Sequence, residues 1–237
     1  MILNAYLNAW AAGRPLQTAI ATTVGQLADA AAALAALASR GPLAHEMQDL
    51  IAHHADGDAQ RRLDIIAEEL VTERLRHAPV RFLASEEKES ALSMLPGAPL
   101  AVAIDPLDGS TNIDANAPLG MIFSLLPAKE SSAATFRQTG RSQLAAGIFV
   151  LGPHTSLLLT LGEGVCLFTL DPTTLIVSAR TYWRSGGKLC TVRSVESTTV
   201  RNTMVAVVAP VSPPVARPPV STPSPPPMVA TASDRST

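Results

Sequence analysis

The chain contains little cysteine and little charge. Only Cys166 and Cys190 occur among its 237 residues, and neither lies in a CxxC or Cys/His pattern. Two cysteines in a chain of this length exclude a disulfide framework and are typical of a reducing cytoplasm, where we expect the protein to reside. Charged residues make up 16% and the formal net charge is −2, which excludes a nucleic-acid binder that relies on bulk positive charge.

The sequence also lacks clear signals for export and membrane insertion. Its opening, MILNAYLNAW, has neither the basic region nor the continuous apolar stretch of a signal peptide, so we expect no export. The longest apolar stretch without acidic or basic residues, 142–162, is nominally long enough to span a bilayer. Gly152, Pro153 and His154 interrupt it, and this turn signal favours two β-strands and no membrane partner.

Hydrophobic residues are plentiful at 47%, which is enough for a buried core and argues against wholesale disorder. Apolar periodicity predicts helices over residues 16–39, 46–54 and 59–76. Short apolar runs between Gly and Pro turns predict strands over residues 80–85, 100–104, 120–126, 144–151, 156–161, 165–170 and 175–179. The order of these elements predicts an α+β layered fold, with N-terminal helices packed on a mostly antiparallel sheet.

The last 57 residues depart from this pattern. Residues 181–237 contain 9 of the 19 prolines, all within APVSPPVARPPVSTPSPPP. Such a composition favours extended polyproline conformations and cannot form a packed core. We therefore expect a folded part over residues 1–180 and a disordered Pro-rich tail over residues 181–237. A ligand for an SH3-type domain is a weaker interpretation of this tail.

Negative charge is concentrated in one part of the chain. Residues 56–114 hold 12 acidic and 6 basic residues, and the rest of the chain carries a net charge of +4. Carboxylates that converge without basic partners raise one another's pKa unless a cation neutralises them. The acidic block therefore predicts a site for a hard divalent cation, Mg²⁺ or Mn²⁺.

The most informative motif is DPLDGST, residues 105–111, which directly follows an apolar strand. A strand end presents Asp105 and Asp108 at one place, and the Leu107 carbonyl can turn inward between them. Gly109 lets backbone N–H groups approach a phosphate closely. An EF-hand is excluded because its third and fifth loop positions would be Leu107 and Gly109. An ordinary Asp-rich turn is the alternative for any one of these dipeptides.

Two further acidic clusters accompany this motif. Glu86 and Glu87 follow the strand VRFLAS, where one can bind a metal and the other a water; a solvated loop is the alternative. Asp58 and Asp64 lie before and within the helix predicted over residues 59–76. The remaining acidic residues of that helix are expected to be surface charges: Glu68, Glu69 and Glu73.

These motifs resemble those of class I fructose-1,6-bisphosphatases. The resemblance is carried by SEE at residues 85–87, DPLDGSTNID at 105–114 and LGMIFSLL at 119–126. The meander at residues 145–172 is similar to that of bacterial Calvin-cycle members, and GDAQRRLDIIAEELV at 57–71 matches the segment with the family's early aspartates. The resemblance extends from about residue 16 to about residue 180, and it implies the N-terminal half of the sugar phosphatase fold.

The resemblance also implies roles for individual residues. Magnesium ligands would be Glu86, Asp105, Asp108 and the Leu107 carbonyl, with Glu87 in metal or water binding. Asp64 would activate the attacking water together with Glu87, and Asp58 would assist from the preceding loop. The groups that hold the sugar 1-phosphate would be Asp108, Gly109, Ser110 and Thr111.

The implied reaction is two-metal, Mg²⁺-dependent hydrolysis of fructose 1,6-bisphosphate to fructose 6-phosphate and phosphate. The resemblance also implies a homotetramer, the usual assembly of the family's enzymes, and a role in gluconeogenesis and the Calvin cycle. Sedoheptulose 1,7-bisphosphate is a further candidate substrate. Family members continue into a second α/β domain, which we do not find after Arg180. We therefore expect a truncated or frameshifted bisphosphatase. The alternative is a catalytically incompetent fragment that retains metal binding.

Overall fold

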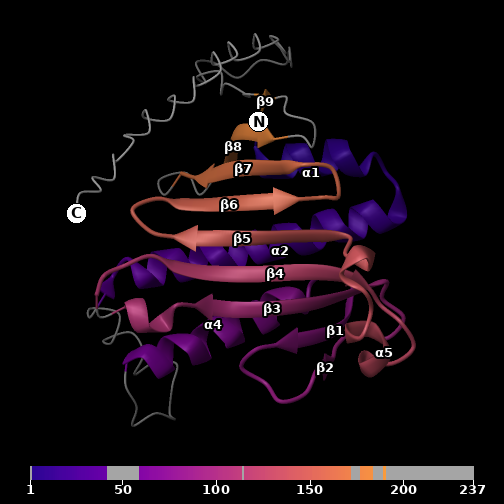
Figure 1. Ribbon diagram of the computed structural model, residues 1–237, viewed down its shortest axis with the longest axis horizontal. Helices are drawn as coiled ribbons and strands as arrows, with labels where there is room; N and C mark the ends of the chain where they lie inside the picture. Colours follow the sequence, from indigo (N-terminus) through magenta and orange to yellow (C-terminus); the bar gives the residue numbers. More distant parts are fainter. Residues whose placement is uncertain (1, 42–58, 114, 172–176, 184–188, 191–237) are drawn as a thin grey trace, which may run out of the picture.

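The structure is a computed structural model that describes residues 2–41, 59–113, 115–171, 177–183 and 189–190. A single nine-stranded sheet lies at its centre (Figure 1). Its strands are β1 (Val80–Ser85), β2 (Leu92–Ser93), β3 (Leu100–Asp108), β4 (Leu119–Pro127), β5 (Ala145–Leu151), β6 (Thr155–Thr160), β7 (Val165–Leu170), β8 (Val177–Trp183) and β9 (Leu189–Cys190).

The strands lie in the order β2-β1-β3-β4-β5-β6-β7-β8-β9. Only β1 and β3 pair in parallel among the described strands; the other neighbours are antiparallel. The predicted mostly antiparallel sheet is thus confirmed. β3 continues four residues past its predicted end at Ile104 and includes the first half of the acidic motif. Asp105 and Asp108 therefore belong to the end of β3 and not to a separate loop.

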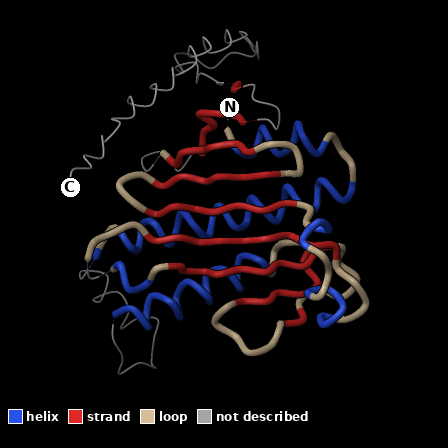
Figure 2. Tube along the Cα trace, viewed as in Figure 1, coloured by secondary structure: helices blue, strands red, loops and turns tan. Residues whose placement is uncertain are grey.

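Helices α1 (Leu3–Ala11), α2 (Pro15–Ala38) and α4 (Ala59–Leu75) pack on one face of the sheet (Figure 2). The two longer ones confirm the predicted helices over 16–39 and 59–76, whereas the helix expected over 46–54 lies outside the described residues. α1 was not predicted, because its apolar face consists of only three buried residues: Leu3, Leu7 and Ala11. The predicted α+β layered fold is thus confirmed, with these helices as one layer and the sheet as the other.

α2 forms the centre of the helical layer. Pro15 lies in its first turn, where its missing N–H costs no hydrogen bond. Its buried face includes the fully buried Val24, Leu27 and Leu34. By length and composition α2 could also cross a membrane, but half of that apolar window is buried within the structure. It packs on α4 and on β5, which accounts for its apolar sequence.

The sheet extends beyond the boundary expected at residue 180. β8 runs to Trp183, and β9 pairs with it through the register Tyr182↔Cys190 and Trp183↔Leu189. β8 overlaps the strand predicted over residues 175–179, and backbone pairing with β7 continues it four residues further, to Trp183. The Pro-rich part of the expected tail lies outside the described residues.

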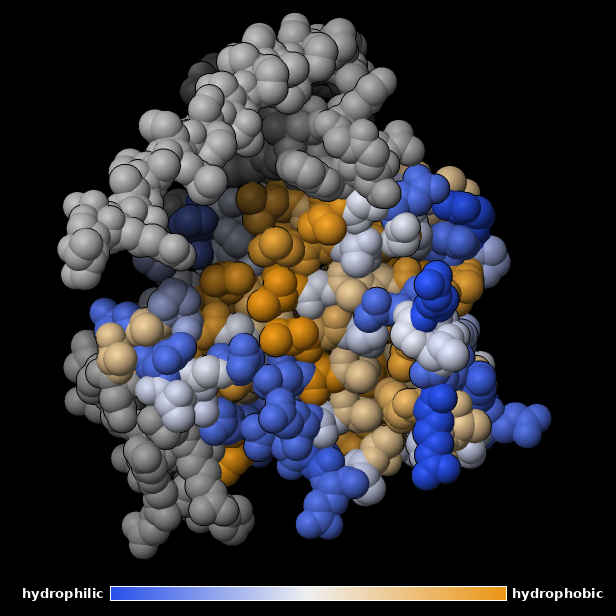
Figure 3. Space-filling model, viewed as in Figure 1, coloured by the Kyte–Doolittle hydropathy of each residue, from blue (hydrophilic) through white to orange (hydrophobic). Residues whose placement is uncertain are grey.

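The second face of the sheet carries no helical layer within the described residues, and apolar side chains gather at its centre (Figure 3). Ile122 is 41% exposed there and Leu158 is 38% exposed. Side chains of β1 and β3–β7 line an open hollow of about 850 Å³ on this face. Glu86 and Asp105 lie at its border, so the acidic strand ends adjoin an apolar surface.

We expect Gly147→Ala to destabilise the fold. A Cβ at this position of β5 would lie 2.7 Å from the Phe123 ring and 2.9 Å from the Leu158 carbonyl oxygen. Overpacking of this kind costs about 1–3 kcal/mol. Urea denaturation of both proteins measures the difference in the free energy of unfolding. Gly140→Ala is the matched control, because nothing lies within 4 Å of its added Cβ; equal stabilities of the two variants would contradict the prediction.

Candidate functional site

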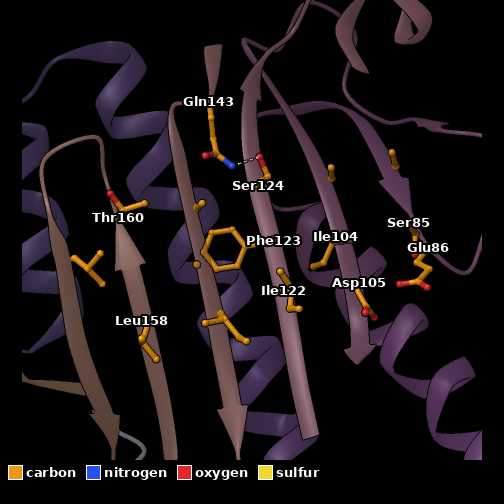
Figure 4. A pocket seen from close by; sticks show the side chains of 16 residues that line it. Ser85, Glu86, Ile104, Asp105, Ile122, Phe123, Ser124, Gln143, Leu158 and Thr160 are labelled. Carbon is orange, nitrogen blue, oxygen red and sulfur yellow. Dashed lines mark hydrogen bonds between the residues drawn. The ribbon is translucent and has the colours of Figure 1, made fainter. Parts of the chain in front are cut away.

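The candidate site is formed where the parallel strands β1 and β3 end side by side. Their register pairs Ser85 with Ile104, so the next residues, Glu86 and Asp105, lie at the same edge. The backbone N–H of Glu86 donates to the Ile104 carbonyl over 3.0 Å. Figure 4 shows both carboxylates at the ends of these neighbouring strands. The parallel pairing thus brings two acids together that are far apart in the sequence.

The Glu86 and Asp105 carboxyl groups interact at these strand ends. Burial raises the pKa of Asp105 to about 6, and the Glu86 carboxyl group adds to this increase as a hydrogen-bonding group and through its charge. The backbone N–H of Leu107, which donates to Asp105 Oδ1 over 3.1 Å, acts in the opposite direction, and the Asp108 charge adds a smaller increase. Two carboxylates this close repel each other when both are charged, and a bound cation would offset that repulsion.

The end of β3 contains an irregularity within the acidic motif, although its last residue, Asp108, still pairs with Gly120 of β4. The register between β3 and β4 is interrupted between Asp105 and Asp108, which takes the intervening Leu107 out of the regular ladder. The Leu107 side chain is 4% exposed and anchors the segment. Asp108 is exposed and lies beside Gly120, where an added Cβ would be 3.4 Å from Asp108 Cβ. The predicted position of the Leu107 carbonyl between the two aspartates stays a prediction.

Gly109 begins the loop that follows. Its φ of +78° lies in the left-handed region, and a Cβ would approach the Asn112 amide to 3.0 Å; both features favour glycine. The short helix η2 (Ser110–Asn112) comes next, and the Asn112 side chain closes the loop by donating to the Pro118 carbonyl over 2.9 Å. Thr111 is exposed in this turn. Three of the four predicted phosphate-binding residues therefore lie in one turn after β3.

Asp64 reaches the site from the helical layer. Its carboxylate oxygen Oδ1 is buried and has no hydrogen-bond partner among the described residues. Burial raises the pKa of Asp64, and the Ser110 hydrogen bond partly opposes this increase. A buried carboxylate oxygen without a partner calls for a donor or a cation. Asp58, the other predicted early aspartate, lies outside the described residues.

Glu87 is exposed in the turn after β1. Its pKa is raised by burial first, and then by the charges of Asp64, Glu86 and Glu68. These electrostatic interactions link the carboxylates from α4 with those from the strand ends. The structure thus brings the predicted acids of α4, β1 and β3 into one electrostatic group.

The prediction for Glu68 was wrong. We expected a surface charge, but Glu68 is 6% exposed. It follows Asp64 by four residues and therefore lies on the same face of α4 as the site. That spacing was the signal in the sequence that could have identified it. Glu69 and Glu73 are exposed, as predicted.

The residues fit a divalent cation in their chemistry. All predicted ligands are hard oxygen donors, which suit Mg²⁺ or Mn²⁺, and Asp64 Oδ1 lacks a partner within the described part of the chain. As they stand, the described residues contain no group of three or more His, Cys, Asp or Glu side chains close enough to hold a metal. The acids form the pair Glu86–Asp105 with Asp64 and Glu87 nearby, so a cation would have to draw them together.

This fold and the acids at its parallel strand ends define the class of protein: a layered α+β protein with an acidic site where two parallel strands end. A family model described as "Fructose-1-6-bisphosphatase, N-terminal domain" matches residues 17–176. The chain belongs to the class 1 fructose-1,6-bisphosphatase family.

Individual relatives agree with this assignment. The chain is 46% identical over 175 residues to a class 1 fructose-1,6-bisphosphatase of Azorhizobium caulinodans, covering 71% of this chain and 53% of that protein. It is 44% identical over 171 residues to one from Nitrobacter hamburgensis, covering 72% and 50%. The crystal structure of Leishmania major fructose-1,6-bisphosphatase in holo form is similar with a TM-score of 0.64 and 25% identity, covering 78% and 55%. The chain spans about half the length of these relatives.

The raised pKa of Asp105 predicts a pH-dependent stability. The folded, metal-free chain binds this proton more tightly than the unfolded chain, so its stabilising contribution is lost as the pH rises from about 3.8 through about 6. Asp105→Asn removes the titration and keeps an acceptor for the Leu107 N–H. Thermal denaturation between pH 4 and pH 7 should show a smaller loss of Tm in this variant. A Tm difference that is the same at every pH would contradict the assignment.

Proposed function

We propose that this chain carries the metal- and 1-phosphate-binding half of an enzyme that hydrolyses fructose 1,6-bisphosphate to fructose 6-phosphate and phosphate. Two observations carry the proposal: the carboxylates Glu86 and Asp105 at adjacent strand ends, and the buried oxygen of Asp64 that lacks a partner among the described residues. Membership of the bisphosphatase family supports it. Residues 1–180 would form this half, and residues 181–237 would lie outside it.

Glu86, Asp105, Asp108 and the Leu107 carbonyl would hold Mg²⁺, or Mn²⁺ in its place, with Glu87 in metal or water binding. When bound, a pair of such cations would polarise the phosphoryl oxygens and lower the pKa of a coordinated water. The attraction of these carboxylates to the cation would offset their mutual repulsion.

Asp64 and Glu87 would accept the proton of the attacking water. Their raised pKa values make them stronger bases than an ordinary exposed carboxylate. The Ser110 hydroxyl, which lowers the pKa of Asp64 and so partly opposes the effect of burial, would orient that carboxylate. As the water oxygen bonds to phosphorus, the bond between phosphorus and the sugar oxygen breaks, and that oxygen must receive a proton. Asp58 would assist from the segment before α4.

The turn after β3 would hold the phosphate through Asp108, Gly109, Ser110 and Thr111. Gly109 permits a close approach of the backbone because it has no Cβ in a left-handed conformation. These groups address the reacting phosphate rather than the distal end of the sugar. Sedoheptulose 1,7-bisphosphate is therefore a further candidate substrate, and the enzyme would serve gluconeogenesis and the Calvin cycle in the cytoplasm.

A second candidate function is that of a fragment which binds the metal without catalysis. The observation in its favour is the match to only about half the length of the curated relatives. In this case the chain would bind Mg²⁺ and would pair with complete subunits. The homotetramer implied by the resemblance would then contain such subunits.

Phosphate release from fructose 1,6-bisphosphate distinguishes the two candidates. We expect release that requires Mg²⁺ and that falls by about 100-fold or more in Asp108→Asn, because an interaction with transition-state charge of this kind contributes on the order of 3–4 kcal/mol. Glu69→Gln, an exposed acid on the same helix as Asp64, is the control and should retain full activity.

Titration with Mn²⁺, followed by electron paramagnetic resonance, completes the comparison. Binding without phosphate release, weakened in Asp105→Asn, supports the fragment. A folded wild-type chain that neither releases phosphate nor binds Mn²⁺ would exclude both functions.

A further inference from the structure

Glu68 has no part in the function proposed above, yet it is the most buried acidic residue that the structure describes. Its two carboxylate oxygens receive separate donors. Oε2 accepts a 2.5 Å hydrogen bond from the Ser85 hydroxyl, and Oε1 accepts one from Thr72 over 3.3 Å and lies 3.2 Å from Lys88 Nζ. The side chain is therefore fully occupied by partners on α4, on β1 and in the turn after β1.

A buried carboxylate is costly unless it is paired and hydrogen-bonded. The Lys88 side chain is 36% exposed, against 8% for that of Glu68, so the ammonium group remains partly hydrated while it neutralises the buried charge. A lysine can achieve this because its apolar stem packs while its head stays in water. Glu68 and Lys88 together attach α4 to the turn that follows β1.

Ser85 connects Glu68 to the backbone of the turn. A serine hydroxyl has one proton, and Ser85 donates it to Glu68. Its oxygen then accepts from the backbone N–H of Glu87 over 3.4 Å. The backbone N–H of Lys88 also donates to the Ser85 carbonyl over 3.3 Å. Both ends of the turn over residues 85–88 are thus connected to a single carboxylate on α4.

We propose that Glu68 is a positioning residue that holds the turn over residues 85–88 and thereby directs Glu86 and Glu87 toward the cation site before any cation binds. The proposal rests on the proposed function, because these are the carboxylates assigned to metal and water there. Partners that orient metal ligands typically change metal affinity by about 10-fold to 100-fold when they are removed.

Two variants of the full chain test the positioning role of Glu68: one changes the acceptor, Glu68, and the other changes the donor, Ser85. Glu68→Gln removes the charge and keeps the side-chain length, with Glu69→Gln as its control. Ser85→Ala removes the hydroxyl link and no charge, with the exposed Ser90→Ala as its control. Ser85→Ala separates positioning from simple charge attraction, and it carries the test alone if Glu68→Gln does not fold. Combining the two should add little to either, because both cut the same connection.

Two measurements follow on all variants: amide hydrogen exchange of residues 85–88 in the metal-free chain, and Mn²⁺ affinity by electron paramagnetic resonance. We expect faster exchange and about tenfold weaker Mn²⁺ binding in Ser85→Ala and Glu68→Gln, with both controls unchanged. Exchange and affinity equal to those of the controls would overturn the proposal. A lower Tm with unchanged exchange and affinity would overturn it as well, because the contact would then be purely structural.

The outcomes separate this proposal from the function on which it rests. A wild-type chain that binds no Mn²⁺ would refute the proposed metal site, while the exchange rates would still decide whether Glu68 holds the turn. Normal Mn²⁺ binding in all variants, with unchanged exchange, would refute the role of Glu68 alone.

Discussion

The parallel pairing of β1 with β3 is the constraint on which the rest of the site depends. Antiparallel neighbours would place Glu86 and Asp105 at opposite edges of the sheet, since their strands would end in opposite directions. The parallel register instead places both residues after Ser85 and Ile104 at one edge. This single pairing determines where the site lies. The bulge in β3, the loop after β3 and the acids of α4 contribute to the site at that position.

The same arrangement creates an electrostatic cost that the fold meets in two ways. At the strand ends, burial and the neighbouring Glu86 carboxyl group raise the pKa of Asp105 to about 6. One helical turn further along α4 from Asp64, Glu68 remains buried because Lys88 and two hydroxyl groups surround it. The carboxyl groups of Asp105 and Glu86 remain available to a cation, whereas that of Glu68 is already bound to Lys88 and two hydroxyl groups. Acids that lie near one another can therefore serve different roles.

The two faces of the sheet also differ. On the helical side, Phe123 and Phe149 pack with ring centroids 5.8 Å apart, and Gly147 leaves room for the Phe123 ring. On the other side, Ile122 and Leu158 remain accessible within the described part of the structure. The acidic pair lies at the border of that open apolar surface, where burial is only partial.

Much of the architecture follows from local sequence patterns. The helical periods of α2 and α4, the apolar strands and the carboxylates after β1 and β3 were all predicted, because spacing along the chain determines which side chains share a face or follow a strand. Tertiary structure alone decided the burial of Glu68, the formation of α1 and the extension of β8 past its predicted end at residue 179. Each depends on contacts between distant segments: Ser85 and Lys88 for Glu68, α2 for α1, and β7 for β8. Burial and strand pairing are properties of those partners, and no local pattern specifies them.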